Sequence, residues 1–325
     1  MTSLAVWNWS KLFGSSSEDV AFDITTGNDG SIYISGFTKG NLNGETNSGD
    51  RDIFISKFNS DGDQIWTQLL GSDQEDEWGK ITIGNDGSIY ISGHVRGDLD
   101  GVTFIGDSDI LISKFNSNGD KIWTKLFGSS DIASGEYAYD ITTDNDGSIY
   151  ICGQTEGDLD GVLNSNSGSD SYTDAFITKF NSDGERIWTK LLGTFAKDDI
   201  GQTITAGLNN SIYLAGYTEG NLDGEINLST GDNDGFITKF NTNGEKIWTK
   251  LLGSSNEAII SGIVTGNDGS IYITGWVKGD LDGQTNNGNK DAFISKLNSN
   301  GEKIWTKLLG SSKEDTATGI TIDSD

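Results

Sequence analysis

Pairs of carboxylates recur in one kind of loop along this chain, and they are the residues best suited to chemistry. In each pair a single leucine separates two acids and a glycine follows, as in the segment from Asp98 to Gly101. The pairs and their amide variants are Asn41 and Asn43, Asp98 and Asp100, Asp158 and Asp160, Asn221 and Asp223, and Asp280 and Asp282. A further Asp ends each loop, at Asp52, Asp109, Asp174, Asp234 and Asp291. Because Ca²⁺ prefers roughly six to eight oxygen ligands, these acidic, glycine-rich loops are candidate calcium sites.

The same loops also have a purely structural interpretation. The sequence Asp-Leu-Asp-Gly lacks the longer series of ligands found in an EF-hand loop. The first acid would then cap a turn, and the leucine would anchor the loop by packing against the core. The last Asp would accept hydrogen bonds from backbone N–H groups. The sequence leaves both interpretations open.

A second set of acids precedes the first strand expected in each repeat. Its members are Asp19, Asp76, Glu136, Asp199, Glu257 and Asp315. Arranged around an axis, they would form an anionic ring at the mouth of a channel, a candidate site for a cation or an amine. The alternative is a solvated acidic rim.

One position changes from repeat to repeat, directly after the glycine that ends the second expected strand. It holds Phe37, His94, Gln154, Tyr217 and Trp276. Aromatic rings there would offer platforms for sugar rings, with acidic neighbours to bind hydroxyl groups. The alternative is aromatic packing between repeats.

Most enzyme classes find no support in the sequence. His94 is the single histidine, and no serine or cysteine motif accompanies it, which argues against nucleophilic triads and histidine-ligated zinc. A carboxylate-dependent glycan-active enzyme is the one enzyme class that stays open.

Regularly spaced tryptophans predict the architecture that positions these residues. Trp9, Trp66, Trp123, Trp188, Trp248 and Trp305 are separated by 57, 57, 65, 60 and 57 residues. A repeat of this length, with short strands and turns of the Asn-Asp-Gly type, is typical of a propeller. In the fifth repeat, strands are expected at about 259–265, 270–275, 291–297 and 303–309. We therefore predict an all-β fold, a β-propeller with five complete four-stranded blades.

The repeats fill the whole chain, so one domain is expected over residues 1–325. Its units lie at approximately 14–70, 71–127, 128–192, 193–252 and 253–309. An extra outer-type strand is expected at 5–13 and an extra inner-type strand at 316–323. A blade completed from these two would lack its middle strands, which predicts an open or incomplete ring and a chain that is a fragment.

The repeat resembles the bacterial SBBP (β-propeller) repeat family. The resemblance lies in segments such as 267–275 (Asn-Asp-Gly-Ser-Ile-Tyr-Ile-Thr-Gly), 291–298 (Asp-Ala-Phe-Ile-Ser-Lys-Leu-Asn) and 304–310 (Ile-Trp-Thr-Lys-Leu-Leu-Gly), and it covers residues 9–325. The resemblance implies the propeller fold and a secreted or surface-exposed protein, and it brings no catalytic residues.

Length variation and charge both concentrate in two sets of loops. All insertions fall between the second and third strands of a repeat or between the fourth strand and the next repeat, which in a propeller lie on the same face. Most of the 49 Asp and Glu residues fall in the same loops, whereas most of the 22 Lys and Arg residues lie on the third and fourth strands. One acidic, variable face is therefore predicted.

The formal net charge of −27 excludes several partners. It repels nucleic acid and anionic membranes and attracts cations. No apolar run approaches the roughly 18 residues of a membrane span, and no standard signal peptide is visible. We expect a location outside the cell or at its surface.

Together these features predict a non-enzymatic binding or display scaffold. Its acidic loop face would bind cations, with Ca²⁺ as the candidate cofactor, and a carbohydrate or a surface protein. The alternatives are a purely structural spacer of a larger surface protein and the carboxylate-dependent enzyme.

Overall fold

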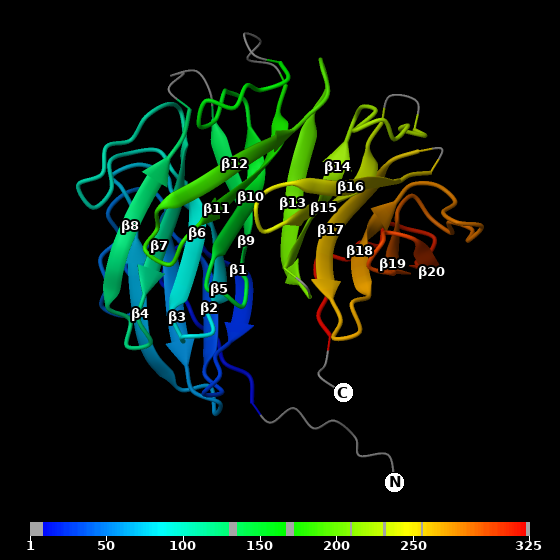
Figure 1. The fold of residues 1–325 in the computed structure, drawn as a ribbon. Coiled ribbons are helices and arrows are strands. Elements are labelled where there is room, and N and C mark those ends of the chain that lie inside the picture. Colours follow the sequence, from blue (N-terminus) through cyan, green and yellow to red (C-terminus); the bar gives the residue numbers. More distant parts are fainter. Residues whose placement is uncertain are drawn as a thin grey trace. The chain divides into compact units, whose positions relative to one another are not determined.

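The computed structural model describes residues 9–129, 135–166, 172–208, 210–229, 232–254 and 256–322. These residues form twenty strands in five antiparallel sheets of four strands each (Figure 1). In every sheet the strands are neighbours in chain order, as predicted for propeller blades. We call the sheets the first to fifth blades. No helix able to span a membrane occurs in the described ranges.

The chain divides into two compact units, and the first consists of Met1–Phe104 and Ile110–Leu126. The strands of the first blade are β1 (Asp19–Thr26), β2 (Ile32–Thr38), β3 (Asp52–Phe58) and β4 (Gln64–Leu70). Those of the second are β5 (Glu77–Ile83), β6 (Ile89–Val95), β7 (Asp109–Phe115) and β8 (Lys121–Phe127). A cluster of buried residues, including Ile53, Ile55 and Ile91, packs these two blades together.

The second unit consists of Ile105–Asp109 and Phe127–Asp325. The third blade holds β9 (Glu136–Thr143), β10 (Ile149–Thr155), β11 (Asp174–Phe180) and β12 (Arg186–Leu192). The fourth holds β13 (Asp199–Gly207), β14 (Ser211–Thr218), β15 (Asp234–Asn241) and β16 (Lys246–Leu252). The fifth holds β17 (Ala258–Thr265), β18 (Ile271–Val277), β19 (Asp291–Leu297) and β20 (Lys303–Leu309). The single-domain interpretation of the sequence stays a prediction.

Local sequence explains why each blade folds this way. The turn between the first two strands needs a residue with positive φ, and Gly30 (φ 76°) and Gly269 (φ 78°) supply it. The second and third strands are buried on both faces, as in β6 and β3, and β-branched and aromatic residues are the most frequent in both. The fourth strand begins exposed and polar, because it is the edge of its sheet.

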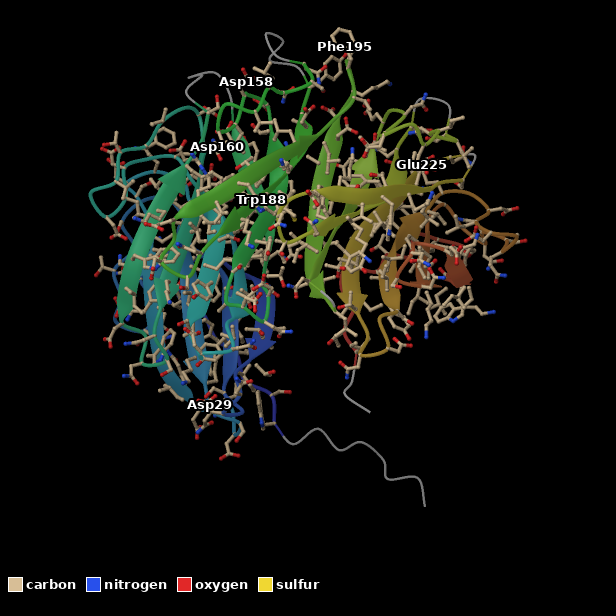
Figure 2. All side chains as sticks on the ribbon, in the orientation of Figure 1. Asp29, Asp158, Asp160, Trp188, Phe195 and Glu225 are labelled. Carbon is tan, nitrogen blue, oxygen red and sulfur yellow. The ribbon has the colours of Figure 1, made fainter. Side chains whose placement is uncertain are left out.

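The repeated tryptophan is a contact between successive blades. Trp66 packs beside Tyr33 of its own blade, with ring centroids 6.1 Å apart. Its other neighbour is the turn glycine of the next blade: a Cβ placed on Gly119 would lie 2.9 Å from the Trp66 indole. Trp188, labelled in Figure 2, covers Gly244 in the same way and donates its indole N–H to Thr242 O at 3.1 Å. The spacing of the tryptophans therefore follows the spacing of the blades.

The extra segments at the ends of the repeat differ from expectation. Of the segment predicted at 5–13, residues 5–8 lie outside the described residues, and 9–13 carry no strand ladder. Trp9 nevertheless covers Gly62 as the other tryptophans cover their glycines, and Phe13 packs against Phe54 and Phe58. Residues 316–322 carry no ladder either, and 323 lies outside the described residues. Each segment lacks the second and third strands of a blade, which would supply its pairing partners.

Candidate functional site

The first acid or amide of each loop between second and third strands closes that loop on itself. Each accepts the backbone N–H six residues further on, at 2.9–3.0 Å. The five acceptors are Asn41, Asp98, Asp158, Asn221 and Asp280. Asp and Asn serve equally because the bond needs only a side-chain oxygen. The leucine that follows, for example Leu159, is fully buried beneath the loop.

The second member of each pair ties its loop to the fourth strand. Asp100 accepts Lys121 Nζ and Thr124 Oγ1, each at 2.6 Å. Asp160, Asp223 and Asp282 make the same two kinds of contact, to the basic residue and the threonine of β12, β16 and β20. Asp158 and Asp160 are labelled on their loop in Figure 2.

The first blade makes this tie with neutral groups. Asn43 donates to Thr67 at 3.1 Å, and Gln64 stands where the other blades carry Lys or Arg. All five second members have a positive φ of 51–60°, a conformation that Asn and Asp tolerate. The first blade thus lacks both the acid and the base of this contact. Because the two are replaced together, we interpret the pair as a structural contact between the loop and the fourth strand.

The last Asp of each loop is turned inward. Asp52, Asp109, Asp174, Asp234 and Asp291 are no more than 1% exposed, and each accepts at least one backbone N–H of its own loop. A glycine after the fourth strand makes room for each carboxylate. A Cβ on Gly193 would lie 2.0 Å from Asp174 Oδ1, and one on Gly310 would lie 2.1 Å from Asp291 Oδ1.

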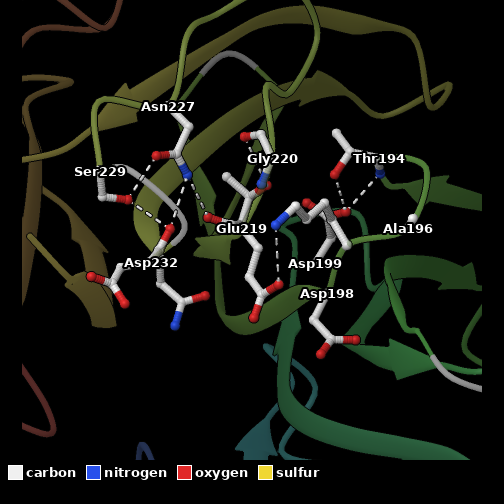
Figure 3. A network of polar contacts seen from close by, with 12 residues as sticks. Thr194, Ala196, Asp198, Asp199, Glu219, Gly220, Asn227, Ser229 and Asp232 are labelled. Carbon is white, nitrogen blue, oxygen red and sulfur yellow. Dashed lines mark hydrogen bonds and ion pairs between the residues drawn. The ribbon is translucent and has the colours of Figure 1, made fainter.

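The acids predicted to line a channel mouth also bind backbone. Asp19, Asp76, Asp199 and Asp315 each accept the N–H of a Ser or Thr in the preceding loop at 2.6 Å, and Glu136 accepts Ser129 N at 2.9 Å. Figure 3 shows the bonds from Thr194 to Asp199. Asp76, Glu136 and Asp199 are fully buried, so these three are not a solvated rim.

Glu257 is the exception in this set. The residue at the start of the first strand is Ala258 in the fifth blade, so no acid occupies the buried position there. Glu257, one residue earlier, binds Lys278 Nζ at 2.5 Å and Asn233 Nδ2 at 3.0 Å. Glu257 therefore lies one residue out of register with the other predicted acids.

The structure brings two predicted sets together, because the loop-ending Asp of one blade meets the first-strand acid of the next. Glu136 N donates to Ser108 O at 3.1 Å, which places Glu136 beside Asp109. A Cβ on Gly128 would lie 2.3 Å from Asp109 Oδ1 and 2.8 Å from Glu136 Oε2. Equivalent backbone bonds join Asp76 to Arg51 and Asp199 to Thr173, beside Asp52 and Asp174.

Burial and the neighbouring charge make these acids unusually weak. Desolvation raises the pKa of Glu136 to about 7, and the negative charge of Asp109 adds to the rise. Burial likewise raises the pKa of Asp199 to about 7 and those of Asp76 and Asp109 to about 6. At neutral pH a proton is therefore held at these positions for part of the time.

The arrangement offers few ligands to a metal ion. Within the ranges that the structure describes, no group of three or more His, Cys, Asp or Glu side chains could hold one. Four buried carboxylate oxygens have no hydrogen-bond partner in the same ranges: Asp109 Oδ1, Asp199 Oδ1, Asp234 Oδ1 and Asp291 Oδ1.

The varying position on the second strand forms what we call the seam row: Phe37, His94, Gln154, Tyr217 and Trp276. Phe37 and His94 are buried, whereas the other three are partly exposed. Burial lowers the pKa of His94 to about 3, so its imidazole is neutral at physiological pH. Gln154 accepts the Tyr139 hydroxyl at 3.0 Å. The contacts of the seam row therefore differ from blade to blade.

The first unit adds an aromatic stack beside the seam row. The rings of Phe22 and Trp78 lie nearly parallel, 4.9 Å apart and inclined by 12°, and Phe37 lies 5.7 Å from Phe22. Trp78 is 36% exposed and has a positive φ of 63°, which strains a bulky side chain. The first and third blades carry Ala21 and Ala138 at this position. Sequence reasoning missed Trp78, although its departure from those alanines was visible.

A polar hollow in the second unit was also missed. It has a volume of about 320 Å³ and lies among the turns that join first and second strands. Asp144, Asp146, Asn210 and Asn267 line it with Leu208, which is 45% exposed. The sequence of the turn could have indicated this hollow. Residues 207–211 are Gly-Leu-Asn-Asn-Ser, whereas the fifth blade has Gly-Asn-Asp-Gly-Ser at the same place.

The family comparison agrees with the strands just described. Residues 122–160, which run from β8 to the loop after β10, match the SBBP model, a beta-propeller repeat. The chain carries an SBBP repeat. Over these residues the match confirms the resemblance to the SBBP repeat that the turn and strand sequences indicated. The bacterial origin stays a prediction.

Two longer proteins are similar to this chain. One is the regulatory protein FlaEY of Caulobacter vibrioides, 28% identical over 210 residues, which cover 60% of this chain and 21% of that protein. The other is an uncharacterized WD repeat-containing protein, L264, of Acanthamoeba polyphaga mimivirus, 22% identical over 98% of this chain and 30% of its own length. The chain therefore spans less than a third of either relative.

A solved structure shows the same fold. An ulvan lyase of polysaccharide lyase family PL25 aligns with a TM-score of 0.52 and 13% identity, over 92% of this chain and 72% of that one. At this identity the likeness concerns the fold alone.

The weakened acids predict an unusual dependence of stability on pH. The pKa of Glu136 rises from 4.5 to about 7 on folding, so the folded state binds its proton more tightly. The free energy of unfolding should therefore fall as the pH rises from about 4.5 to about 7, by up to about 3 kcal/mol for this group. We expect Glu136→Gln to remove that part of the slope, measured by urea unfolding across this pH range.

The control is Asp146→Asn, which removes the same charge from an exposed turn residue. It should lower the overall charge repulsion without changing the slope between pH 4.5 and 7. A Glu136→Gln profile parallel to that of the wild type would contradict the assignment.

Proposed function

We propose that this chain is a non-enzymatic binding scaffold that presents the seam row and its aromatic neighbours to a partner. One observation supports this most: the Asp that ends the loop between second and third strands accepts a backbone N–H of that loop in all five blades, whereas the seam row changes its chemistry. Residues that serve the blade are kept alike, and a surface for ligands is free to vary. We assign the scaffold to the cell exterior, where Ca²⁺ is abundant enough to fill weak sites.

The partner that the first unit suits best is a carbohydrate. The stack of Phe22 and Trp78 offers a partly exposed apolar ring face, and Glu77 and Arg51 lie beside Phe37 with polar groups for hydroxyls. The ulvan lyase named above makes anionic polysaccharides reasonable members of a first panel, although the charge of −27 favours neutral glycans.

Replacement of Trp78 tests this proposal without unfolding the blade. Trp78→Ala loses a stack worth about 0.5–1.5 kcal/mol and keeps the left-handed backbone strain, because alanine also carries a Cβ. Stability should therefore fall by about 1 kcal/mol or more, since the buried part of the indole is lost as well, while glycan affinity falls about threefold or more. Binding would be measured on a glycan array and by calorimetry with the strongest member.

The matched control is Phe195→Ala, which removes an aromatic side chain that is 83% exposed in the second unit (Figure 2). Its glycan affinity should equal that of the wild type. An array without any binder would favour the structural spacer, and turnover of a polysaccharide would favour the carboxylate-dependent enzyme.

Cation binding is a second candidate function, favoured by the unpartnered oxygen of Asp109. Asp109 and Glu136 would supply carboxylate ligands to Ca²⁺, and protons would compete for the same oxygens. A specific ligand at about 100 times its Kd stabilises the folded state by about 2.7 kcal/mol. We expect the Tm in Ca²⁺ to exceed that in EDTA by a few degrees, and Asp109→Asn to remove most of the difference. Identical melts at fixed ionic strength would contradict calcium binding.

A further inference from the structure

Each blade places a second residue close to its member of the seam row. This residue directly precedes the buried Asp that begins the third strand. The second and third strands pair in the same register in three blades. Phe37 pairs with Ile53, Tyr217 with Gly235 and Trp276 with Ala292. The preceding residues are Arg51, Ser108, Thr173, Asn233 and Lys290. We call this the capping position.

In two blades the capping residue is a cation that covers the aromatic ring. The Arg51 guanidinium lies 4.7 Å from the centroid of Phe37, and Lys290 Nζ lies 3.9 Å from that of Trp276. Two acids at the start of the second blade assist in the first blade, where Arg51 binds Glu75 of the loop and Glu77 of β5. The chain's own side chains thus show that this position accepts an ammonium or a guanidinium group over a ring.

The fourth blade has the ring and the acids without the cation. Tyr217 is partly exposed, and its capping residue is the neutral Asn233. Asn233 Nδ2 donates to Glu257 at 3.0 Å, while Asn233 Oδ1 is buried and accepts no hydrogen bond from the described residues. That oxygen is a ready acceptor for an N–H of a bound cation.

Negative charges of nearby acids act on the Tyr217 hydroxyl. Burial raises its pKa to about 12, and the charges of Asp198, Glu257 and Glu219 contribute to the rise. Two of these acids have partners, because Lys278 binds Glu257 at 2.5 Å and Lys197 approaches Glu219 at 3.7 Å. Asp198 accepts Thr173 N at 2.9 Å and forms no ion pair among the described residues. Glu219 N donates to Asp198 O at 3.0 Å, and Figure 3 shows both residues. The charge of Asp198, which acts on Tyr217, is therefore not offset by a cation of the described residues.

We propose that Tyr217, Asn233 and Asp198 form a binding site for an organic cation, an ammonium or guanidinium group that a ligand brings to the place filled by Arg51 and Lys290 in other blades. This inference rests on the proposed function and deepens it, since it names the ligand chemistry of one member of the seam row. Amino sugars, polyamines and lysine side chains share this chemistry. A bare metal ion would not use the ring in the same way, because it requires oxygen ligands.

The most direct test introduces a lysine whose ammonium group would occupy the proposed site. Asn233→Lys reproduces the capping residue of the fifth blade at the same register, so it should fold with an unchanged or higher Tm. The probes are glucosamine, spermidine and a tetrapeptide with one lysine, with N-acetylglucosamine as the uncharged counterpart of the first. Affinities would be measured by ligand-observed NMR at low and high salt.

We expect glucosamine to bind about 2- to 30-fold more tightly than N-acetylglucosamine. Asn233→Lys should abolish this preference, and Tyr217→Leu should do the same, which keeps the test valid if the lysine variant is unstable. Tyr217→Phe, which keeps a ring, should retain most of the preference. The amine that binds most tightly identifies the source of the cation.

Equal binding of charged and neutral sugars to the wild type, or a preference that survives in Asn233→Lys, would overturn the inference. The glycan test at Trp78 concerns the other unit, and its readout is independent of Tyr217. Failure of the carbohydrate proposal and failure of the cation site are therefore distinguishable.

Discussion

The structure depends on buried carboxylates that accept backbone amides at the junctions between strands. A loop that turns back onto a sheet leaves N–H groups without partners, and a buried donor without an acceptor is costly. Asp76, Asp174 and Asp199 meet this need from inside the protein, and glycines such as Gly193 leave the space for them. The strong negative charge of the chain is therefore in part structural, and the second and third strands keep their register because their connecting loop is fixed.

This constraint determines which residues recur from blade to blade and which vary. The acids, the turn glycines and the tryptophans each contact backbone or a neighbouring blade, so a change at any of them disturbs a repeated junction. The seam row does not hold such a repeated junction in place. Its members pack, accept a hydrogen bond or receive a cation according to their own neighbours, as Phe37, Gln154 and Trp276 show. A rigid frame that carries varying side chains is suited to binding.

Much of the fold could be predicted from the sequence because each blade is built from local signals. The alternating β-branched strands and Asn-Asp-Gly turns gave the strands of the fifth blade to within two residues. The meeting of Asp109 with Glu136 could not be predicted, because it depends on a backbone bond between residues in separate repeats. The ring of Phe37 beneath Arg51 escaped notice for a similar reason, since strand pairing and not sequence adjacency brings them together. The strained conformation of Trp78 has no signature beyond its difference from Ala21 and Ala138.

Amide hydrogen exchange tests the central claim most directly, because it reads the bonds that the buried acids accept. Ser72, Ser129 and Thr194 lie in loops, yet their N–H groups bind Asp76, Glu136 and Asp199. We predict that these amides exchange at least about a hundredfold more slowly than those of the exposed loop residues Asp73 and Phe195, close to the rates of the strands. Exchange of all five amides at similar, fast rates would show that the carboxylates do not hold the loops, and would contradict the account.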